Sequence, residues 1–249
     1  MNGLTIVKLG GSVITDKSRP GVIREENLAA LAAVLAAADT PLIIVHGAGS
    51  LGHPEAKAYG IADGVTRTNA RGVYETHAAV SRLNEAVVSA LRNAGVEAVS
   101  LHPFACSLTE HGRLVFCGEE QIRCLAAAGI VPVLHGDVAM DTKKGGCIIS
   151  GDQIVPYLAE VLGISRVGIV TETGGVLGNG VIVPEISRKN AASFDLGAAE
   201  TTDVTGGMRG KIEEMLLLAD KGIVSAIFAP EYLSGFLAGK PVRGTLVKP

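Results

Sequence analysis

The sequence has little of several residue types and patterns, and each scarcity excludes a class of protein. It contains no tryptophan, and all aromatic residues together make up 4% of its 249 residues, so we expect an aliphatic core. No apolar run reaches the roughly 18 residues that a membrane-spanning helix needs. The N-terminus also lacks the cationic and apolar segments of a signal peptide. We therefore predict a cytoplasmic protein with no membrane partner.

The cysteines and the net charge give no indication of disulfides, a zinc site or a nucleic-acid partner. The four cysteines, at positions 106, 117, 124 and 147, have no CxxC spacing and form no zinc signature, so free thiols are expected. With 22 Lys and Arg against 25 Asp and Glu, the net charge is −3. This balance gives no general reason to bind nucleic acid, and we predict no such partner.

One stretch organises the rest of the chain. An apolar run typical of a buried strand, 42–45, leads into His46-Gly-Ala-Gly-Ser-Leu-Gly-His53. Glycines lack a Cβ, so their backbone N–H groups can approach an anion closely, and a following helix would add its dipole. His53 ends this turn and could bond a phosphate. The alternative, a plain glycine-rich loop with a surface histidine, stays open at this point.

A second strand with the same ending precedes it. Residues 4–9 are apolar except for Lys8, and they run into Gly10-Gly11-Ser12, with Lys17 close behind. An alanine-rich helix over 25–38 separates the two strands, which predicts a parallel βαβ unit. Both glycine turns then lie at the carboxyl edge of one sheet, where open α/β folds bind ligands. Lys17 could instead be an ordinary solvated loop charge.

The remaining chain repeats this alternation of strands and helices. We predict strands over 98–101, 130–134, 147–149, 167–171, 223–229 and 244–247, and helices over 70–93, 119–128, 151–162 and from 208 onward. A hairpin is expected around 111–113, and a loop or broken helix over 54–68. The first half of helix 70–93, with Tyr74 and His77, could face the core or line a substrate pocket. Asp152 could cap its helix or orient lysines.

The glycine turns and cations point to phosphate chemistry. Lys8, Lys17, Lys211 and His53 suit more than one phosphate group, and phosphoryl transfer needs mainly positioning and positive charge. The sequence has neither a Walker sequence nor the protein-kinase motifs. It also lacks a serine nucleophile elbow and a metal-binding histidine pair, which argues against those hydrolases. The sequence therefore predicts a phosphate site of a different architecture.

Four motifs together carry a family resemblance. Lys8-Leu-Gly-Gly-Ser12, His46 to His53, Ser150-Gly-Asp-Gln153 and Asp203-Val-Thr-Gly-Gly-Met-Arg-Gly-Lys211 occur in this order. The chain thereby resembles the amino acid kinase superfamily and, within it, the isopentenyl phosphate kinases, of which His53 is the most specific mark. The resemblance implies an α/β fold, a three-layer αβα sandwich on a mostly parallel sheet. It also implies a homodimer, with an acceptor-binding lobe over 1–145 and an ATP-binding lobe over 146–249.

The resemblance also implies roles for individual residues. Catalysis would fall to Lys8, Lys17, His53, Asp152 and Lys211. The acceptor, isopentenyl phosphate, would contact Gly11, Ala48, Gly49, His53 and Gly136. ATP would contact Lys8, Gly10, Gly11, Ser12, Gly49, Ser150, Glu172, Gly207 and Lys211. The amides of Gly10, Gly11, Ala48 and Gly49 would cradle phosphates, and Mg²⁺ would arrive with ATP, without a protein cage of its own.

One segment departs from the family pattern, and two other functions remain alternatives. Where the family usually has Thr-Asp-Val-Asp-Gly-Val-Tyr, this chain has Thr171-Glu-Thr-Gly-Gly-Val-Leu177, which keeps one acid as Glu172. The first alternative is a fosfomycin-type kinase, which acts on a compact phosphonate. It differs in needing no apolar pocket for a tail, which helix 70–93 and Phe104-Ala105-Cys106 could supply. The second is a non-catalytic binder of a nucleotide or oxyanion.

Overall fold

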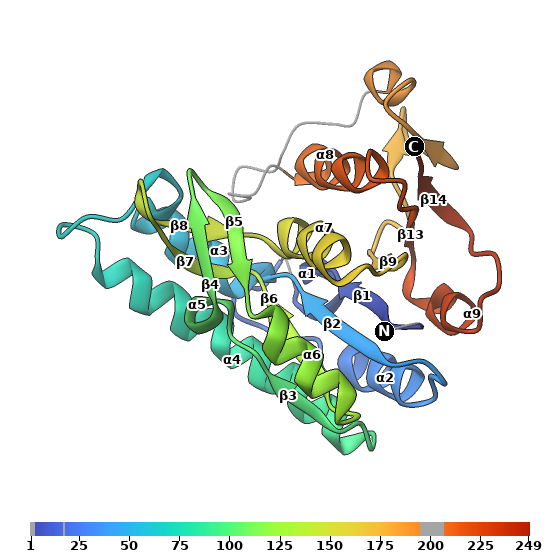
Figure 1. Cartoon of the computed structure of the whole chain (residues 1–249), viewed down its shortest axis with the longest axis horizontal. Coiled ribbons are helices and arrows are strands. Elements are labelled where there is room, and N and C mark those ends of the chain that lie inside the picture. Colours follow the sequence, from blue (N-terminus) through green and yellow to red (C-terminus); the bar gives the residue numbers. More distant parts are fainter. Residues whose placement is uncertain (1–2, 17, 195–206) are drawn as a thin grey trace.

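The protein is built around one large sheet with helices on both faces (Figure 1). The computed structural model describes residues 3–16, 18–194 and 207–249. The sheet has the strand order β12-β14-β13-β9-β1-β2-β6-β3, and all its neighbours pair in parallel except β13 and β14. Its strands are β1 (Thr5–Leu9), β2 (Leu42–His46), β3 (Ala98–Ser100), β6 (Val131–His135), β9 (Arg166–Val170), β12 (Glu185–Ile186), β13 (Ser225–Phe228) and β14 (Gly244–Val247).

Smaller elements complete the described part of the chain. A second sheet, in the order β5-β4-β7-β8, contains β4 (Ser107–Glu110), β5 (Arg113–Cys117), β7 (Asp137–Asp141) and β8 (Gly145–Ile149), and a two-stranded ribbon contains β10 (Leu177–Gly178) and β11 (Val181–Ile182). The helices are α1 (Gly11–Ile14), α2 (Glu25–Ala36), α3 (Gly49–Ala58), α4 (Arg71–Asn93), α5 (Pro103–Cys106), α6 (Glu119–Ala127), α7 (Gly151–Leu162), α8 (Gly207–Ala219) and α9 (Leu233–Leu237). Short 3₁₀ turns cover Ile61–Asp63, Ala191–Ser193 and Pro230–Tyr232.

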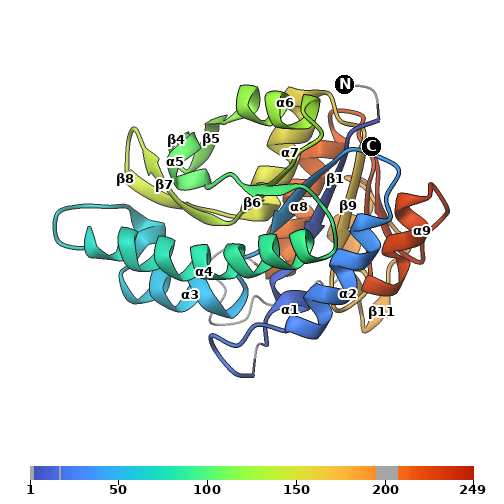
Figure 2. The same cartoon turned by 90° about the horizontal axis from the view of Figure 1, so that it is seen from below.

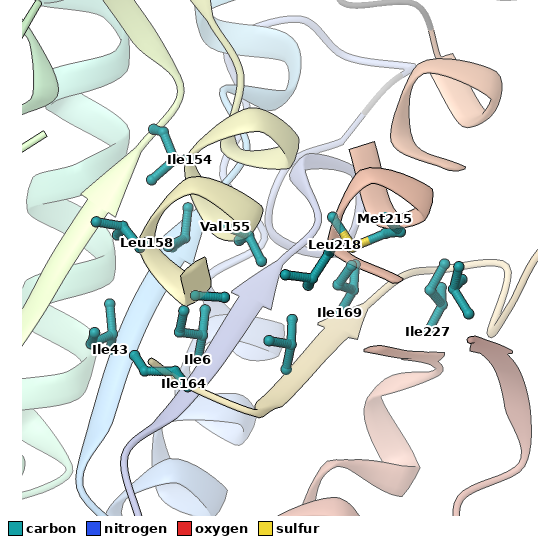
Figure 3. Close-up of a cluster of buried hydrophobic side chains, with 14 of the residues drawn as sticks. Ile6, Ile43, Ile154, Val155, Leu158, Ile164, Ile169, Met215, Leu218 and Ile227 are labelled. Atoms are coloured by element: carbon teal, nitrogen blue, oxygen red, sulfur yellow. The ribbon is translucent and has the colours of Figure 1, made fainter. Parts of the chain in front are cut away.

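The central strands are apolar on both faces because both faces are covered. Ile6 and Ile43 belong to the core beneath α7 and α8, whereas their neighbours Val7 and Ile44 belong to the core beneath α2 and α4. Figure 3 shows the first core, in which Ile6 lies among side chains of α7. Figure 2 shows the layers, with α3 and α4 on the side of the sheet opposite α6 and α7. This is the predicted three-layer αβα architecture, and continuous apolar strands are its usual signature.

Most predicted elements are confirmed, and strand β7 was missed. The segment 54–68, expected as a loop or broken helix, contains the end of α3 (Gly49–Ala58), the 3₁₀ turn Ile61–Asp63 and irregular chain before α4, so this expectation is confirmed. Pro54 is the sixth residue of α3, and because it has no N–H it removes one hydrogen bond from that helix. Strand β7 was not predicted at all; it follows β6 after the single residue Gly136. The predicted hairpin around 111–113 is confirmed as β4 and β5.

The two predicted lobes share the large sheet. Strands β1, β2, β3 and β6 precede residue 146 and the others follow it, with β1 paired to β9 across the division. All four cysteines are free thiols, as predicted. Among the described residues, we find no helix that combines the length and the apolar character needed to cross a bilayer.

Candidate active site

The strands β1, β2, β6 and β9 end at the same edge of the sheet, and a cavity of about 440 Å³ opens there. Its lining includes every predicted site residue that the structure describes: Lys8, Gly10, Gly11, Ser12, Ala48, Gly49, His53, Gly136, Ser150, Asp152, Glu172, Gly207 and Lys211. Lys17 and the motif residues 203–206 lie outside the described residues. Residues from positions 8 to 211 are thus brought to one place.

Two lysines share one carboxylate at the centre of this cavity. Lys8 comes from the end of β1, Asp152 from the first turn of α7 and Lys211 from α8. Lys8 Nζ lies 2.5 Å from Asp152 Oδ1, and Lys211 Nζ lies 2.7 Å from Oδ1 and 2.9 Å from Oδ2. We call these three residues the lysine cluster. With both lysines protonated its charges sum to +1, which suits a site for anions.

Burial and neighbouring charges set the ionisation of the lysine cluster. The Lys8 side chain is 3% exposed, and this burial, aided by Lys211 and opposed by Asp152, lowers its pKa to about 7. Burial alone would raise the pKa of Asp152, but the ammonium groups of Lys211 and Lys8 outweigh it and hold that pKa well below its usual range. Asp152 does not cap α7, since Ser150 Oγ accepts the Gln153 N–H at 3.2 Å. Asp152 therefore holds the two lysines.

The two glycine turns touch each other through their backbones. A Cβ on Gly11 would come within 2.5 Å of Gly49 Cα, and one on Gly49, whose φ is +57°, would come within 2.2 Å of Thr15 Oγ1. Thr15, which we did not predict, links the turns: its hydroxyl donates to Gly11 O at 2.8 Å and accepts from Ser50 N at 3.0 Å. The first amides of α1 and α3 therefore lie side by side at the cavity.

The prediction for the Gly10 amide was wrong. The Gly10 N–H donates to Val170 O at 2.9 Å, which ties the turn to the end of β9, so it cannot also hold a phosphate. Gly11 and Ser12 begin α1, and Ala48 and Gly49 begin α3; amides at such positions have no partner within their own helix. The starts of these two helices line the cavity, and the Gly10 amide is already used by β9.

The walls of the cavity differ in character. His53 projects from the first turns of α3, and Gly207 begins α8 on the opposite wall. Glu172 follows β9 at the rim, where its carboxylate accepts from Arg24 Nη1 at 2.9 Å. Deeper in, the lining is apolar and comes chiefly from Ala56, Val80, Ile148 and Ile149.

The predicted tail-pocket residues are placed elsewhere. Tyr74 is 70% exposed and is not part of the cavity lining, so neither alternative, core or substrate pocket, holds for it. His77 and Phe104 pack against each other, with ring centroids 4.9 Å apart, behind Asp137, which does line the cavity. Helix α4 does contribute to the pocket, but through Thr76 and Val80, one turn apart on its inner face.

A cluster of buried histidines next to the cavity was missed by sequence reasoning. His46 and His135 end the paired strands β2 and β6, and their rings stack at 5.3 Å. His135 also contacts His102, whose Nδ1 lies 3.0 Å from His135 Nε2. His77 pairs with Asp137, with 3.0 Å between Nδ1 and Oδ2. We call His46, His77, His102, His135 and Asp137 the histidine cluster. The signal in the sequence was the repeated His-Gly after an apolar strand.

Burial controls the charge of the innermost histidines. It lowers the pKa of His46 and lowers that of His135 well below the ordinary value, so both rings are neutral at pH 7. His46 Nε2 lies 3.1 Å from the side-chain Oδ1 of Asn84, whose Nδ2 donates to Ser100 Oγ at 2.7 Å. The hydrogen bond that His77 donates to Asp137 raises the pKa of this partly exposed histidine. The cluster therefore differs from the lysine cluster in being mostly uncharged.

Comparison with known proteins identifies the family. A model of the amino acid kinase family matches residues 3–229. The chain belongs to the amino acid kinase family. Within this family it is 40% identical to the isopentenyl phosphate kinase of Haloferax volcanii and 38% identical to that of Methanothermobacter thermautotrophicus, with 98% of each chain covered in both comparisons. A solved isopentenyl phosphate kinase structure matches with a TM-score of 0.81 and 34% identity, over 98% of this chain and 100% of that one.

Proposed function

We propose that this amino acid kinase family member transfers the γ-phosphoryl group of ATP to isopentenyl phosphate, giving isopentenyl diphosphate and ADP. An oxygen of the acceptor phosphate attacks Pγ, a new P–O bond forms, and the bond from Pγ to the β–γ bridging oxygen breaks. The observation that carries the proposal is the lysine cluster facing two helix starts in one cavity. Several relatives named isopentenyl phosphate kinase support the choice of acceptor.

Charge stabilisation would come from the lysine cluster. Lys8 and Lys211 converge on one point, so both could contact the transferred group and the leaving oxygen of ADP while Asp152 holds them apart. Charged groups fixed in advance often contribute most of the rate enhancement in such reactions, because they need no reorganisation when the transition state forms. The amides at the starts of α1 and α3 would hold phosphate oxygens between acceptor and donor.

The acceptor would lie between His53 and the apolar pocket. His53 is proposed to donate a hydrogen bond to the acceptor phosphate, with Gly136 nearby, and the five-carbon tail would lie against Val80 and Ile148. A compact, polar phosphonate such as fosfomycin would leave that apolar surface in contact with water. The pocket therefore favours isopentenyl phosphate over fosfomycin.

ATP would lie toward α8 and the end of β9, near Ser12, Ser150, Glu172 and Gly207. The described carboxylates that line the cavity are each already paired with a cationic or imidazole group: Asp152 with two lysines, Glu172 with Arg24 and Asp137 with His77. This pairing agrees with a Mg²⁺ ion held mainly by phosphate oxygens of ATP, as is usual for this hard cation. From the sequence resemblance, Lys17 is also proposed to assist at the phosphates, and the protein to act as a cytoplasmic homodimer.

A coupled ADP-release assay with ATP and Mg²⁺ tests the proposal directly. We expect turnover with isopentenyl phosphate and little or none with fosfomycin. His53→Ala should keep the fold, checked by circular dichroism, and lose most of its kcat/KM for isopentenyl phosphate. Preference for fosfomycin would replace the proposed acceptor, and binding of ATP without turnover on either compound would favour the non-catalytic alternative.

A further inference from the structure

Three members of the histidine cluster come together from separate elements in a way the phosphoryl transfer does not use. His77 lies on α4, His102 immediately precedes α5, and Asp137 begins β7. One ligand atom from each residue lies within 4.8 Å of those of the other two. We propose that His77, His102 and Asp137 form a binding site for a divalent transition-metal ion of the zinc type, separate from the Mg²⁺ that accompanies ATP.

The carboxylate is already fixed in a ligand position. Asp137 Oδ2 lies 3.0 Å from His77 Nδ1, while its Oδ1 accepts the Val138 N–H at 2.8 Å and Oδ2 accepts the Phe104 N–H at 3.3 Å. Two ligand atoms on a tetrahedral zinc ion lie about 3.3 Å apart, given bonds of about 2.0 Å. This pair therefore needs to separate by only a few tenths of an ångström to admit the ion, and the His102 ligand atom lies within 4.8 Å of both.

Hydrogen bonds behind His102 assign its ligand atom. His135 Nδ1 lies 3.0 Å from Gly136 O, a carbonyl that can only accept, so Nδ1 of His135 carries the proton. Its Nε2 must then accept from His102 Nδ1, at 3.0 Å. The lone pair of His102 is thereby left on Nε2. A ligating histidine usually donates its other ring N–H to such a partner, which holds the ring in position.

His77 has the matching arrangement and an access route. With Nδ1 directed at Asp137, its Nε2 lies 3.4 Å from Ser81 Oγ, which can accept the second ring proton. The His77 side chain is 26% exposed, whereas Asp137 is fully buried. A second hollow, lined in part by Ser81, Ser100 and His102, reaches His102 from outside. An ion could therefore enter without passing through the ATP cavity.

The ligand types select the ion. Two imidazole nitrogens and one carboxylate oxygen suit Zn²⁺, with water as the fourth ligand, whereas Mg²⁺ and Ca²⁺ prefer oxygen ligands alone. Because the three residues come from α4, the start of α5 and the start of β7, the ion would join these elements. The expected consequence is a stabilising link behind the wall of the cavity that contains Asp137.

The test is Zn²⁺ binding to the metal-free full-length protein, measured by competition with a chromogenic chelator. We expect one strong site per chain, and His77→Gln and His102→Gln should each weaken binding about a hundredfold or more. Two histidine controls should bind like the wild type: His111→Asn, in the β4–β5 hairpin, and His53→Ala, in the ATP cavity. Co²⁺ should give the intense visible absorption of a tetrahedral site in the wild type and not in His102→Gln.

A thermal melt provides a second readout that needs no catalysis. One equivalent of Zn²⁺ should raise the Tm of the wild type and of His111→Asn but not that of His102→Gln, since an ion that binds only the folded state stabilises it. Unchanged affinity in both glutamine variants would overturn the proposal, as would loss of binding in His53→Ala. The proposal would also be overturned if the protein could not compete with the chelator for Zn²⁺. His77 and Asp137 would then be only a hydrogen-bonded pair.

Discussion

Two buried polar clusters lie at the same edge of the sheet, and they differ in charge. The lysine cluster carries two ammonium groups on one carboxylate, whereas the histidine cluster consists mainly of neutral rings around Asp137. They are close neighbours, since Gly136 N donates to His46 O and a Cβ on Gly151 would lie 3.1 Å from Lys8 Cε and 3.2 Å from His46 O. The same backbone edge therefore supports a cationic cluster and, beside it, a set of mainly neutral donors and acceptors.

The difference arises from what each cluster needs in order to be stable. Burying Lys8 is costly, and the cost is tolerated because Asp152 compensates it and because an anionic ligand would compensate it further. The buried histidines need only hydrogen-bond partners, which the chain itself supplies through Asn84 and Gly136. Substitutions in the first cluster should therefore affect catalysis, and those in the inner part of the second should affect stability.

The largest expected effect is that of Lys8→Met. It removes one of two converging charges but keeps most of the side-chain volume, so kcat should fall about 10³-fold or more while the protein still folds. Steady-state kinetics with isopentenyl phosphate and a circular dichroism melt measure both. If Lys8→Met retains more than a tenth of wild-type kcat, Lys8 has no essential role in the transfer step. The proposed difference in function between the two clusters would then lose its main support.

The pH dependence of kcat/KM should be the next largest effect. Lys8 acts only when protonated, and its pKa in the free protein is lowered to about 7, so kcat/KM should decrease up to tenfold per pH unit above that value. Bound ATP adds negative charge and raises this pKa, so kcat should decrease only at higher pH. A profile of kcat/KM that stays flat to pH 9 would contradict the assignment.

The same shift has a consequence for stability with a defined sign. Between pH 7 and the ordinary value of 10.5, the unfolded chain holds the Lys8 proton and the folded protein has released it. Stability of the ligand-free protein should therefore rise with pH over this range. Urea titrations at several pH values measure this rise, and Lys8→Met should abolish its contribution.

Asn84→Ala should have the opposite effect to Lys8→Met: it should lower stability and leave kcat nearly unchanged. The side chain of Asn84 is fully buried and bonded to both His46 and Ser100, so its removal leaves buried polar groups unpaired and should lower the free energy of unfolding by about 2 kcal/mol. The kcat of the folded fraction should stay near that of the wild type. Glu85→Ala, an exposed neighbour on α4, is the matched control and should change stability by less than about 0.5 kcal/mol. A lower kcat in Asn84→Ala without loss of stability would contradict the assignment of the inner histidine cluster to stability rather than catalysis.

The smallest effect is expected at the rim. Glu172 is 49% exposed and paired with Arg24, so Glu172→Gln should change stability by less than about 1 kcal/mol. A modest rise in KM for ATP, with kcat unchanged, would support the proposed contact with the nucleotide. Isothermal titration with a non-hydrolysable ATP analogue measures the binding change directly, and no change in affinity would remove Glu172 from the ATP site.

The sequence by itself determined the parallel α/β fold and most of the residues that line the cavity. Apolar strands that end in glycine and alternate with helices predicted a parallel sheet, and in such a sheet all carboxyl ends meet at one edge. That rule is why Lys8 and Gly49 could be assigned to one place from their order alone, whereas the family resemblance assigned Gly136 and Asp152; the cavity contains all four. The resemblance in four motifs added Lys211, which lies 59 residues beyond Asp152 along the chain.

Only the tertiary structure decided which groups are already paired and which side chains face each other across elements. The Gly10 amide is used by Val170, and Tyr74 faces solvent while Thr76 and Val80 face the cavity, because helix rotation and strand pairing are set by packing. In the histidine cluster only His46 and His135 share a sequence pattern, His-Gly after an apolar strand, and His77 and His102 join them through tertiary contacts alone. Such contacts depend on how α4 and α5 pack on β6 and β7, and no local pattern of residues encodes that packing.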